Sequence, residues 1–420
     1  MRPTVKLPIL FVITFFIWTG IQTGILCKYW DMPNHDDALK YETLAQECVN
    51  EGVWYPGIHN TNDSFIFGPA YINLLICIHY LFGAFFYIRF LNLALNMLIV
   101  IEIYILAKRL FGKETGYLSA IFYMLIFSNF YAPIAMLTDL PFTCLLLTAI
   151  LLCTEEKIFP IITGGIFIAL ANWMRPLAVI FLIPIIIFLI LKKRKWTYFA
   201  ALLLSLSITV FIIGTSSKSR TGNFIYQSVS GGFNLAMSCS DNANGLVNID
   251  IINYDSVYAP IDSPEYTFTE RDNLYKKNAI QWIKKNPEKY LAQLPYKLVM
   301  LYSEDTWSER VKPNMGFSNV LAKIKGDKSA LVKLGITVAI KSLMYYFILF
   351  FFCYYVWMNR KKLFKEKNLL LLIPLLGTAV NLIFVITTRY HYPYMFIITI
   401  YAAEAFREKS LKVIDKIFDK

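Results

Sequence analysis

The chain has 420 residues, of which 57% are hydrophobic and only 17% are charged, and its formal net charge is +12. So apolar a composition excludes an ordinary soluble protein, whose polar residues could not cover this much apolar surface. The excess of lysine and arginine is typical of the cytoplasmic loops of membrane proteins, and no nucleic-acid-binding motif accompanies it. The composition therefore predicts an all-α polytopic membrane protein without a nucleic-acid partner.

The first apolar segment, residues 7–27, is longer than the hydrophobic region of a signal peptide, and no small-x-small cleavage site follows it. We interpret it as an uncleaved membrane span. The acidic sequence WDMPNHDDALKYETLAQECV comes next. It predicts a helix that begins after Pro33 and is capped by Asn34 or Asp36.

Nine further apolar segments are candidate membrane spans, each predicted from its length and its lack of charge. They are residues 90–107, 117–133, 138–153, 158–174, 176–191, 197–215, 335–358, 368–387 and 392–406.

Segment 65–83 decides the count of spans, because it is apolar but contains Gly68 and Pro69. If it crosses the bilayer, the basic turn at residues 108–116 falls outside, against the positive-inside rule. If it lies along the outer interface, every short basic cluster falls on one side. We therefore expect a bundle of about ten (10–11) transmembrane helices in the cell (plasma or inner) membrane, with both termini cytoplasmic.

This topology divides the chain into three regions. Residues 1–215 form an N-terminal transmembrane catalytic module, which includes a first outer loop at residues 28–89. Residues 216–334 form a large extracytoplasmic loop. Residues 335–420 contain the last transmembrane helices and a basic cytoplasmic tail.

One part of the large outer loop has helical periodicity. In residues 269–307, lysines separate apolar residues that recur at helical spacing. This pattern predicts interfacial amphipathic helices, interrupted at Pro287 and Pro295.

The predicted helix after the first span carries the first candidate site. Asp37, Tyr41 and Ala45 follow one another at intervals of four residues and therefore share one helix face. A carboxylate at the mouth of a helix bundle is partly desolvated, which suits a proton acceptor. The simpler alternative is that Asp36 and Asp37 only favour the positive end of the helix dipole.

Further ionisable residues are predicted at the same outer face. Asp139 begins an apolar segment, and an ionisable residue at such a position is a functional candidate. Arg175 and Arg389 are outer cations whose guanidinium groups suit phosphate oxygens, or else reach the lipid headgroups. His391 is a further candidate because it follows Arg389 by two residues. The simpler alternative is a histidine that only packs against its neighbours.

Seven segments occur in an order that is typical of one enzyme family. They are HDDALKYETLAQE, FGPAYINLLICIHYLFG, RFLNLALNMLIVIEIYILAKRLFGKETGYLSAIFYML, MLTDLPFTCLLL, GGFNLAMSCSDNANG, AIQWIKKNPEKYLAQLPYKL and RYHYP. Taken together, they resemble the GT-C membrane glycosyltransferases. The resemblance is to the family-39-like branch that contains the protein O-mannosyltransferases and the aminoarabinose transferase of lipid A.

The resemblance implies a GT-C-type bundle and an enzyme that transfers a hexosyl or pentosyl group with inversion. The donor would be a polyprenyl-phosphate sugar, and the acceptor an extracytoplasmic lipid, envelope glycan or protein. At matching positions, Asp37 is implied as the catalytic base and Asp139 as the second acid. The chain departs from many relatives at Ala38, where they have glutamate, so a supporting role there is lost or moves to Asp36.

The resemblance also implies a set of substrate-binding residues. Arg389 would contact the donor phosphate, and Arg175 is a second candidate for that contact. Asp36, Tyr41 and His391 complete the set. Relatives differ in whether they bind a divalent metal, and the sequence leaves the metal open.

Two other functions remain as alternatives. A polymerase or ligase of envelope polysaccharide would use the same lipid-linked substrate and is favoured by the lysine-rich outer loop. A flippase or transporter of a lipid-linked sugar would place polar residues near the bilayer midplane and often has internal repeats, and the sequence shows no repeat.

Overall fold

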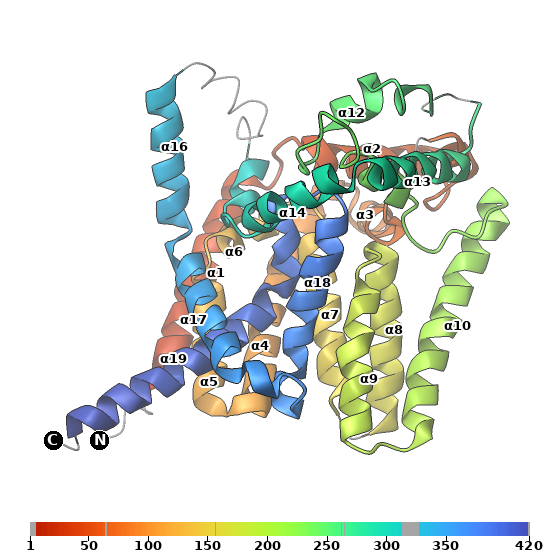
Figure 1. Cartoon of the computed structure of the whole chain (residues 1–420). Coiled ribbons are helices and arrows are strands. Elements are labelled where there is room, and N and C mark those ends of the chain that lie inside the picture. Colours follow the sequence, from red (N-terminus) through yellow and green to blue (C-terminus); the bar gives the residue numbers. More distant parts are fainter. Residues whose placement is uncertain are drawn as a thin grey trace.

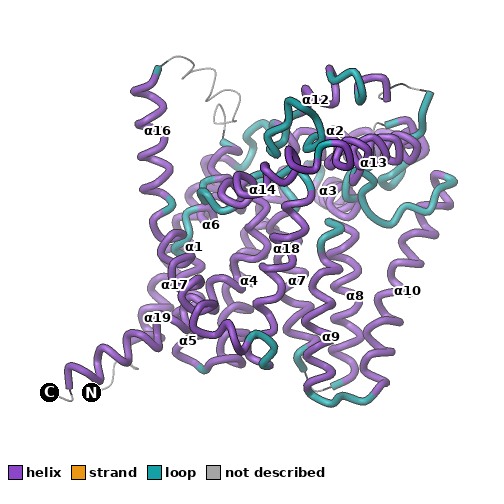
Figure 2. The backbone as a smooth tube through the Cα atoms, viewed as in Figure 1, coloured by secondary structure: helices purple, strands orange, loops and turns teal. Residues whose placement is uncertain are grey.

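The protein is described from a computed structural model that covers residues 6–63, 65–155, 157–261, 263, 265–312 and 327–418. Within these ranges the chain is helical, and its extended pairings are two isolated bridges, Ile66 with Val229 and Leu246 with Ile386. Figure 2 shows helices joined by loops and no strand in the part it describes.

Long apolar helices form a bundle, and other helices lie across one end of it (Figure 1). The bundle helices are α1 (Lys6–Tyr29), α4 (Ile88–Phe111), α5 (Lys113–Met124), α7 (Asp139–Cys153), α8 (Ile158–Met174), α9 (Leu182–Leu191), α10 (Trp196–Thr221), α17 (Leu343–Asn359), α18 (Leu372–Ile383) and α19 (Met395–Phe418).

We call the end that these other helices lie across the covered end. The main helices there are α2 (Asp36–Glu51), α3 (Pro69–Phe82), α13 (Phe268–Lys285) and α14 (Pro287–Leu301). Shorter or peripheral helices are α6 (Ser128–Tyr131), α11 (Gly231–Ala236), α12 (Ile249–Tyr254) and α16 (Lys328–Lys341). A 3₁₀ segment, η10 (Thr388–Tyr394), leads into α19.

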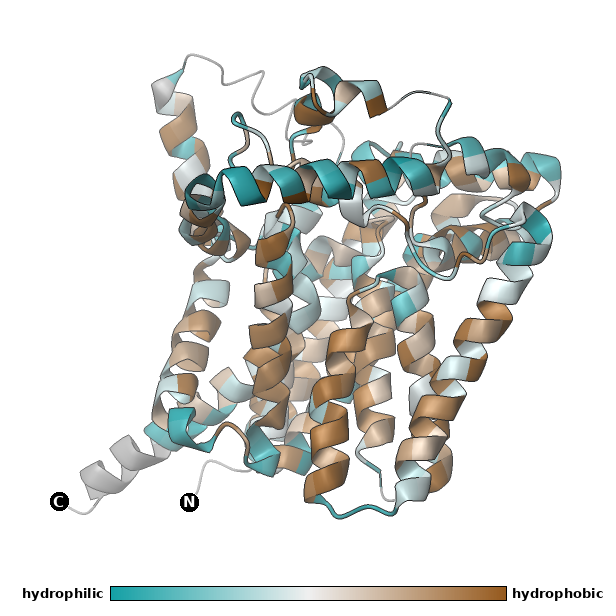
Figure 3. Cartoon of the chain, turned by 45° about the vertical axis from the view of Figure 1, so that its right-hand side comes forward, coloured by the Kyte–Doolittle hydropathy of each residue, from teal (hydrophilic) through white to brown (hydrophobic). Residues whose placement is uncertain are grey.

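The exposed surface of the bundle is apolar, as in a membrane protein. Figure 3 shows hydrophobic residues along the bundle helices, whereas hydrophilic and hydrophobic residues alternate on the long helix that lies across the covered end. On α10, Leu204, Ile208 and Phe211 are each more than half exposed. Such a surface is stable against lipid chains, since in water it would be a large exposed apolar patch.

Among the described residues, four helical stretches are long and apolar enough to span a membrane, or up to six if each bent pair counts as one span. The four are 6–29, 85–111, 196–221 and 366–383. Each predicted span coincides with a helix or a helix pair. Three of these helical stretches, 139–153, 158–174 and 178–191, are shorter than a full span, so the expected count of about ten stays a prediction. Segment 313–326 of the predicted outer loop lies outside the described residues.

The single predicted span at residues 335–358 is wrong in one respect. The chain breaks at Ser342 into α16 and α17, whose axes differ by 58°. Segment 117–133 is bent as well, by 69° between α5 and the turn that follows it. Hydropathy does not reveal such bends, because each pair taken together is apolar enough for one span.

The helix α3 lies beside α2 near the covered end (Figure 1). Its 14 residues would reach about 21 Å at 1.5 Å per residue, less than the roughly 30 Å of a bilayer core. Pro69 is its first residue, a position where the missing N–H is not needed. These features agree with the expected interfacial placement of segment 65–83.

Two local expectations need correction. Helix α2 begins at Asp36 with His35 as its N-cap, and no side chain caps it. The predicted cap Asn34 is used elsewhere, since its amide donates to Glu42 Oε2 at 2.8 Å. In the outer loop, the amphipathic helices separate at Pro287 only, and Pro295 lies inside α14 without ending it.

Candidate active site

An ion pair at the covered end joins two distant parts of the sequence. Asp37, in the first turn of α2, pairs with Arg389 of η10, which lies 352 residues later. The Arg389 side chain is 18% exposed and that of Asp37 is 45% exposed. The two residues that the sequence analysis proposed as base and phosphate contact are therefore neighbours, at a place that solvent can reach.

A second acid–cation pair joins the start of one bundle helix to the end of the next. Asp139 is the first residue of α7, and Arg175 directly follows the end of α8. Arg175 Nη1 lies 2.9 Å from Asp139 Oδ1, and Arg175 Nε donates to Thr138 Oγ1 at 2.7 Å. The Asp139 side chain is only 1% exposed, so its carboxylate depends on Arg175 for charge compensation.

The two pairs share one environment around Tyr41 of α2. Burial raises the pKa of Tyr41, and the charges of both pairs act on it: the acids raise that pKa further and the arginines lower it. The same four charged groups act on the phenol of Tyr390, next to Arg389 in η10. Both tyrosines therefore stay protonated and can donate a hydrogen bond among these four charges.

Arg389 remains a cation in this setting. Burial alone would lower the pKa of Arg389, but the neighbouring carboxylates of Asp37 and Asp139 outweigh it and raise that pKa above its usual value. Its Nε atom is buried without a hydrogen-bond partner. The guanidinium thus keeps capacity for a further anionic group, such as a phosphate oxygen.

A residue that the sequence analysis missed, Arg89, holds the backbone on which both acids are placed. Its side chain is fully buried at the start of α4. Its guanidinium donates to carbonyl groups of Tyr29, Trp30 and Met32, just before α2, and Nε donates to Ile134 O at 3.0 Å, just before α7. One arginine therefore fixes the segments that lead to Asp37 and to Asp139.

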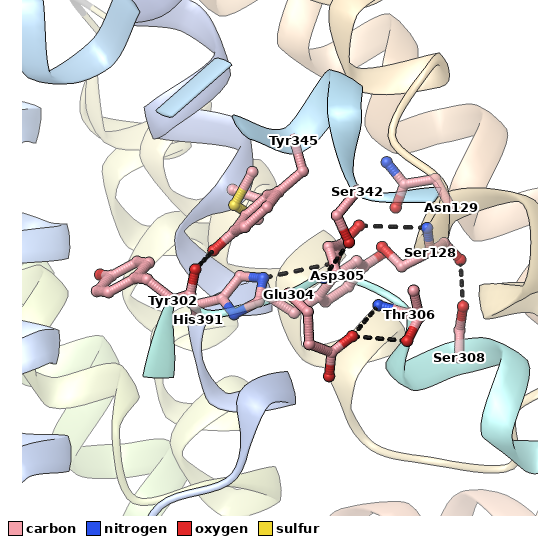
Figure 4. A network of polar contacts seen from close by, with 12 residues as sticks. Ser128, Asn129, Tyr302, Glu304, Asp305, Thr306, Ser308, Ser342, Tyr345 and His391 are labelled. Carbon is pink, nitrogen blue, oxygen red and sulfur yellow. Dashed lines mark hydrogen bonds and ion pairs between the residues drawn. The ribbon is translucent and has the colours of Figure 1, made fainter. Parts of the chain in front are cut away.

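Two other predicted site residues lie apart from these pairs. Asp36 points to solvent, with a side chain 72% exposed and its Oδ2 2.9 Å from His35 Nδ1. His391 is fully buried, with Nδ1 2.9 Å from the Leu301 carbonyl and Nε2 facing Asp305 (Figure 4). In this geometry His391 contacts the protein on both ring nitrogens, so the substrate contact expected for it has no free ring atom.

An apolar cavity of about 770 Å³ adjoins the second ion pair. Its walls are single faces of α3, α4, α7, α8 and α10, and they include Met174 and Pro141, next to Arg175 and Asp139 in sequence. Among its lining residues, Arg220 and Glu102 carry side chains that can be charged. Glu102 was not foreseen; its Oε1 accepts from Thr148 at 2.6 Å, and its Oε2 has no hydrogen-bond partner.

The acids of the candidate site are paired with arginines and do not gather as metal ligands. In the described part of the chain, no group of three or more histidine, cysteine, aspartate and glutamate residues gathers where it could hold a metal ion. Asp37 and Asp139 are each paired with an arginine instead.

Residues 68–217 match the model of the dolichyl-phosphate-mannose-protein mannosyltransferase family. The predicted resemblance to the GT-C membrane glycosyltransferases is confirmed. The glycosyltransferase match runs from the start of α3 into α10 and includes Asp139, Arg175 and most of the residues that line the cavity. Neither Asp37 nor Arg389 lies inside it. No curated protein matches the chain.

Solved structures with a related arrangement include two membrane glycosyltransferases. The oligosaccharyltransferase of Archaeoglobus fulgidus in the apo form aligns with 97% of this chain and 52% of its own, at 12% identity and a TM-score of 0.49. ArnT from Cupriavidus metallidurans bound to undecaprenyl phosphate aligns with 94% and 77%, at 8% identity and a TM-score of 0.38. The chain thus spans about half the length of the archaeal enzyme. At this level of similarity the alignments say nothing about substrates.

Proposed function

We propose that this protein is an inverting glycosyltransferase that moves a sugar from a polyprenyl-phosphate donor to an acceptor outside the cytoplasm. The observation that carries the proposal is the pairing of Asp37 with Arg389 beside the pair of Asp139 and Arg175. It places one carboxylate within reach of solvent and one guanidinium with unused donor capacity at the same site. The family match to residues 68–217 supports the reaction class.

In the mechanism that we propose, the donor phosphate takes the place of Asp37 as the partner of Arg389. The carboxylate of Asp37 is then free to accept the proton of an acceptor hydroxyl. The acceptor oxygen forms a bond to the anomeric carbon, and the bond from that carbon to the phosphate oxygen breaks on the opposite face. Arg389 stabilises the negative charge that develops on the departing polyprenyl phosphate.

The pair of Asp139 and Arg175 contributes to the same site. Asp139 is buried and already compensated by Arg175, so it is poorly placed to exchange protons with solvent. We assign it to orienting Arg175 toward the donor, as the second acid of the site. Tyr41 and Tyr390 supply phenolic hydroxyl groups beside both pairs, where they can bind the sugar or the phosphate.

The apolar cavity supports a lipid-linked donor. Its wall begins at residues next to Arg175 and Asp139 and continues along α4 through Leu91, Leu95 and Leu98. A prenyl chain placed there would bury apolar surface while its phosphate stayed at the charged end. The alternatives of a polysaccharide polymerase and a flippase gain no specific support from this geometry.

The site would lie on the extracytoplasmic side of the cell membrane, with both chain termini cytoplasmic. This placement follows from the positive-inside distribution of the basic loops and from the gathering of the charged pairs at the covered end. The acceptor, a lipid, a glycan or a protein, and the hexosyl or pentosyl nature of the sugar are left to experiment.

A comparison of cells tests the proposal as a whole. Lipids and glycans are profiled in cells that lack the protein, and in the same cells supplied with the wild type or with Asp37→Asn. We expect one sugar to disappear from its acceptor in the deletion, and its polyprenyl-phosphate form to accumulate. Only the wild type should restore the sugar; equal restoration by Asp37→Asn would refute the catalytic assignment.

A further inference from the structure

Two consecutive acids, Glu304 and Asp305, contact the segment η10 that carries Arg389. Thr388 precedes Arg389 and hydrogen-bonds the Glu304 side chain. His391 follows it by two residues and faces the Asp305 side chain, with Nε2 3.4 Å from Oδ1. The acids therefore contact η10 on both sides of Arg389, without contacting Arg389 itself.

The contact of His391 with Asp305 is completely enclosed. Both side chains have no exposed surface. Because Nδ1 lies 2.9 Å from the carbonyl of Leu301, that nitrogen carries a hydrogen and donates it. The rings of Tyr345 and Tyr302 lie against the imidazole at 5.0 and 5.8 Å between centroids, so the ring cannot turn away (Figure 4).

Asp305 is itself fixed by separate elements. Its Oδ2 accepts from the backbone N–H of Ser128 in α6 at 3.2 Å. Its own N–H donates to Ser342 Oγ, at the bend between α16 and α17, at 3.1 Å. Its Oδ1 has no hydrogen-bond partner, and His391 is the group nearest to supply one. A buried carboxylate in this state requires such a partner.

Glu304 is fixed in a similar way. Its Oε2 accepts from the N–H and the hydroxyl of Thr306 at 2.5 and 2.6 Å, and its Oε1 pairs with Arg310. Burial would raise the pKa of Glu304, but Arg310, Thr306 and Thr388 outweigh it and hold that pKa below its usual value. Glu304 therefore stays ionised and keeps its hold on Thr388.

We propose that Glu304 and Asp305 are positioning residues, which hold η10 through Thr388 and His391 so that Arg389 is aimed at the donor phosphate. This inference rests on the proposed function. Its basis is that the hydrogen bond the structure records for the Arg389 side chain is to Asp37, a partner that the donor displaces. Once Asp37 is displaced, that hydrogen bond is lost, and the direction of the guanidinium depends more strongly on how η10 is held.

The test compares Asp305→Asn, His391→Gln and the double variant in steady-state kinetics with a polyprenyl-phosphate sugar. Each single variant leaves one group of the pair without its complement and should let η10 shift. We expect the donor KM to rise about tenfold to a hundredfold, the range for a misplaced contact, and kcat to fall as well, because Arg389 also stabilises the departing phosphate. The double variant restores a neutral hydrogen-bonded pair and should recover most of the wild-type KM.

A matched control separates positioning from loss of stability. Glu404 on α19 is also a buried carboxylate, and its Oε2 accepts a hydrogen bond of 2.6 Å from Thr115 Oγ1. This contact does not involve η10. Glu404→Gln should lower the melting temperature without raising the donor KM. If Glu404→Gln raises the KM as much as Asp305→Asn does, the positioning role is overturned.

A second readout does not depend on sugar transfer. Asp37→Cys and Arg389→Cys are combined in a chain whose exposed cysteines (Cys27, Cys77 and Cys353) are replaced by serine, and a short bismaleimide bridges the pair. Adding Asp305→Asn should reduce the bridged fraction severalfold. A reduced bridge with an inactive wild type would support the positioning role and sink the proposed function. An unchanged bridge and an unchanged KM in Asp305→Asn would overturn the positioning role alone.

Discussion

Replacing Asp37 by asparagine should separate catalysis from stability, because the two effects differ greatly in size. Asparagine keeps the shape of the side chain and removes its charge. The Asp37 side chain is 45% exposed, so its pair with Arg389 is largely screened by solvent and contributes about 1 kcal/mol or less to folding. A general base contributes about 100- to 10,000-fold to the rate of its step. The variant should therefore lose almost all transfer and almost no stability.

The assay is single-turnover transfer from a polyprenyl-phosphate sugar by purified protein in detergent, with a melting curve of each sample. The matched control is Asp36→Asn, which removes the neighbouring charge. That side chain is 72% exposed and contacts His35, so its loss should leave the rate nearly unchanged. A loss of rate of only about threefold in Asp37→Asn would be far smaller than the loss expected for a removed general base, and it would refute the reasoning.

Three further predictions follow from the contacts of the site. Arg175→Gln leaves the carboxylate of Asp139 buried and uncompensated, so the free energy of unfolding should fall by about 3–5 kcal/mol. Adding Asp139→Asn to the same chain should recover most of that loss. If denaturant titration shows no loss for Arg175→Gln, the carboxylate is not buried as a charge. Arg89→Ala leaves several buried carbonyl groups without a donor, so both melting temperature and transfer should fall, and a fully active, stable variant would exclude its organising role. Leu95→Trp narrows the apolar cavity and should weaken a long-chain donor far more than a short-chain analogue, whereas an equal effect on both would remove the chain from the cavity.

Much of the bundle could be predicted from sequence because the signal is a long run of apolar residues. The bends could not, since the two helices on either side of Ser342 together still pass as one apolar span. Pro295 shows the opposite error, because a proline expected to end a helix is accommodated inside α14. The interfacial placement of α3 stays a prediction from its polar interruptions, and its short length agrees with it.

The candidate site could be predicted only in part. The spacing of Asp37 and Tyr41 marks one face of a helix, and both lie at the charged cluster. The partner of each acid could not be read from the sequence, since Arg389 is 352 residues away from Asp37. Arg89 was missed because an arginine beside an apolar segment is most simply explained by contact with lipid headgroups, whereas here it binds backbone carbonyls.

The most direct test of the account is the anomeric configuration of the product. Purified wild-type protein is given a polyprenyl-phosphate sugar of defined configuration, and the new glycosidic bond is examined by NMR. Attack opposite the phosphate, with Asp37 as the base, predicts a product of inverted configuration and one free polyprenyl phosphate for each bond formed. A product of retained configuration, or a donor that is never consumed, would contradict the account.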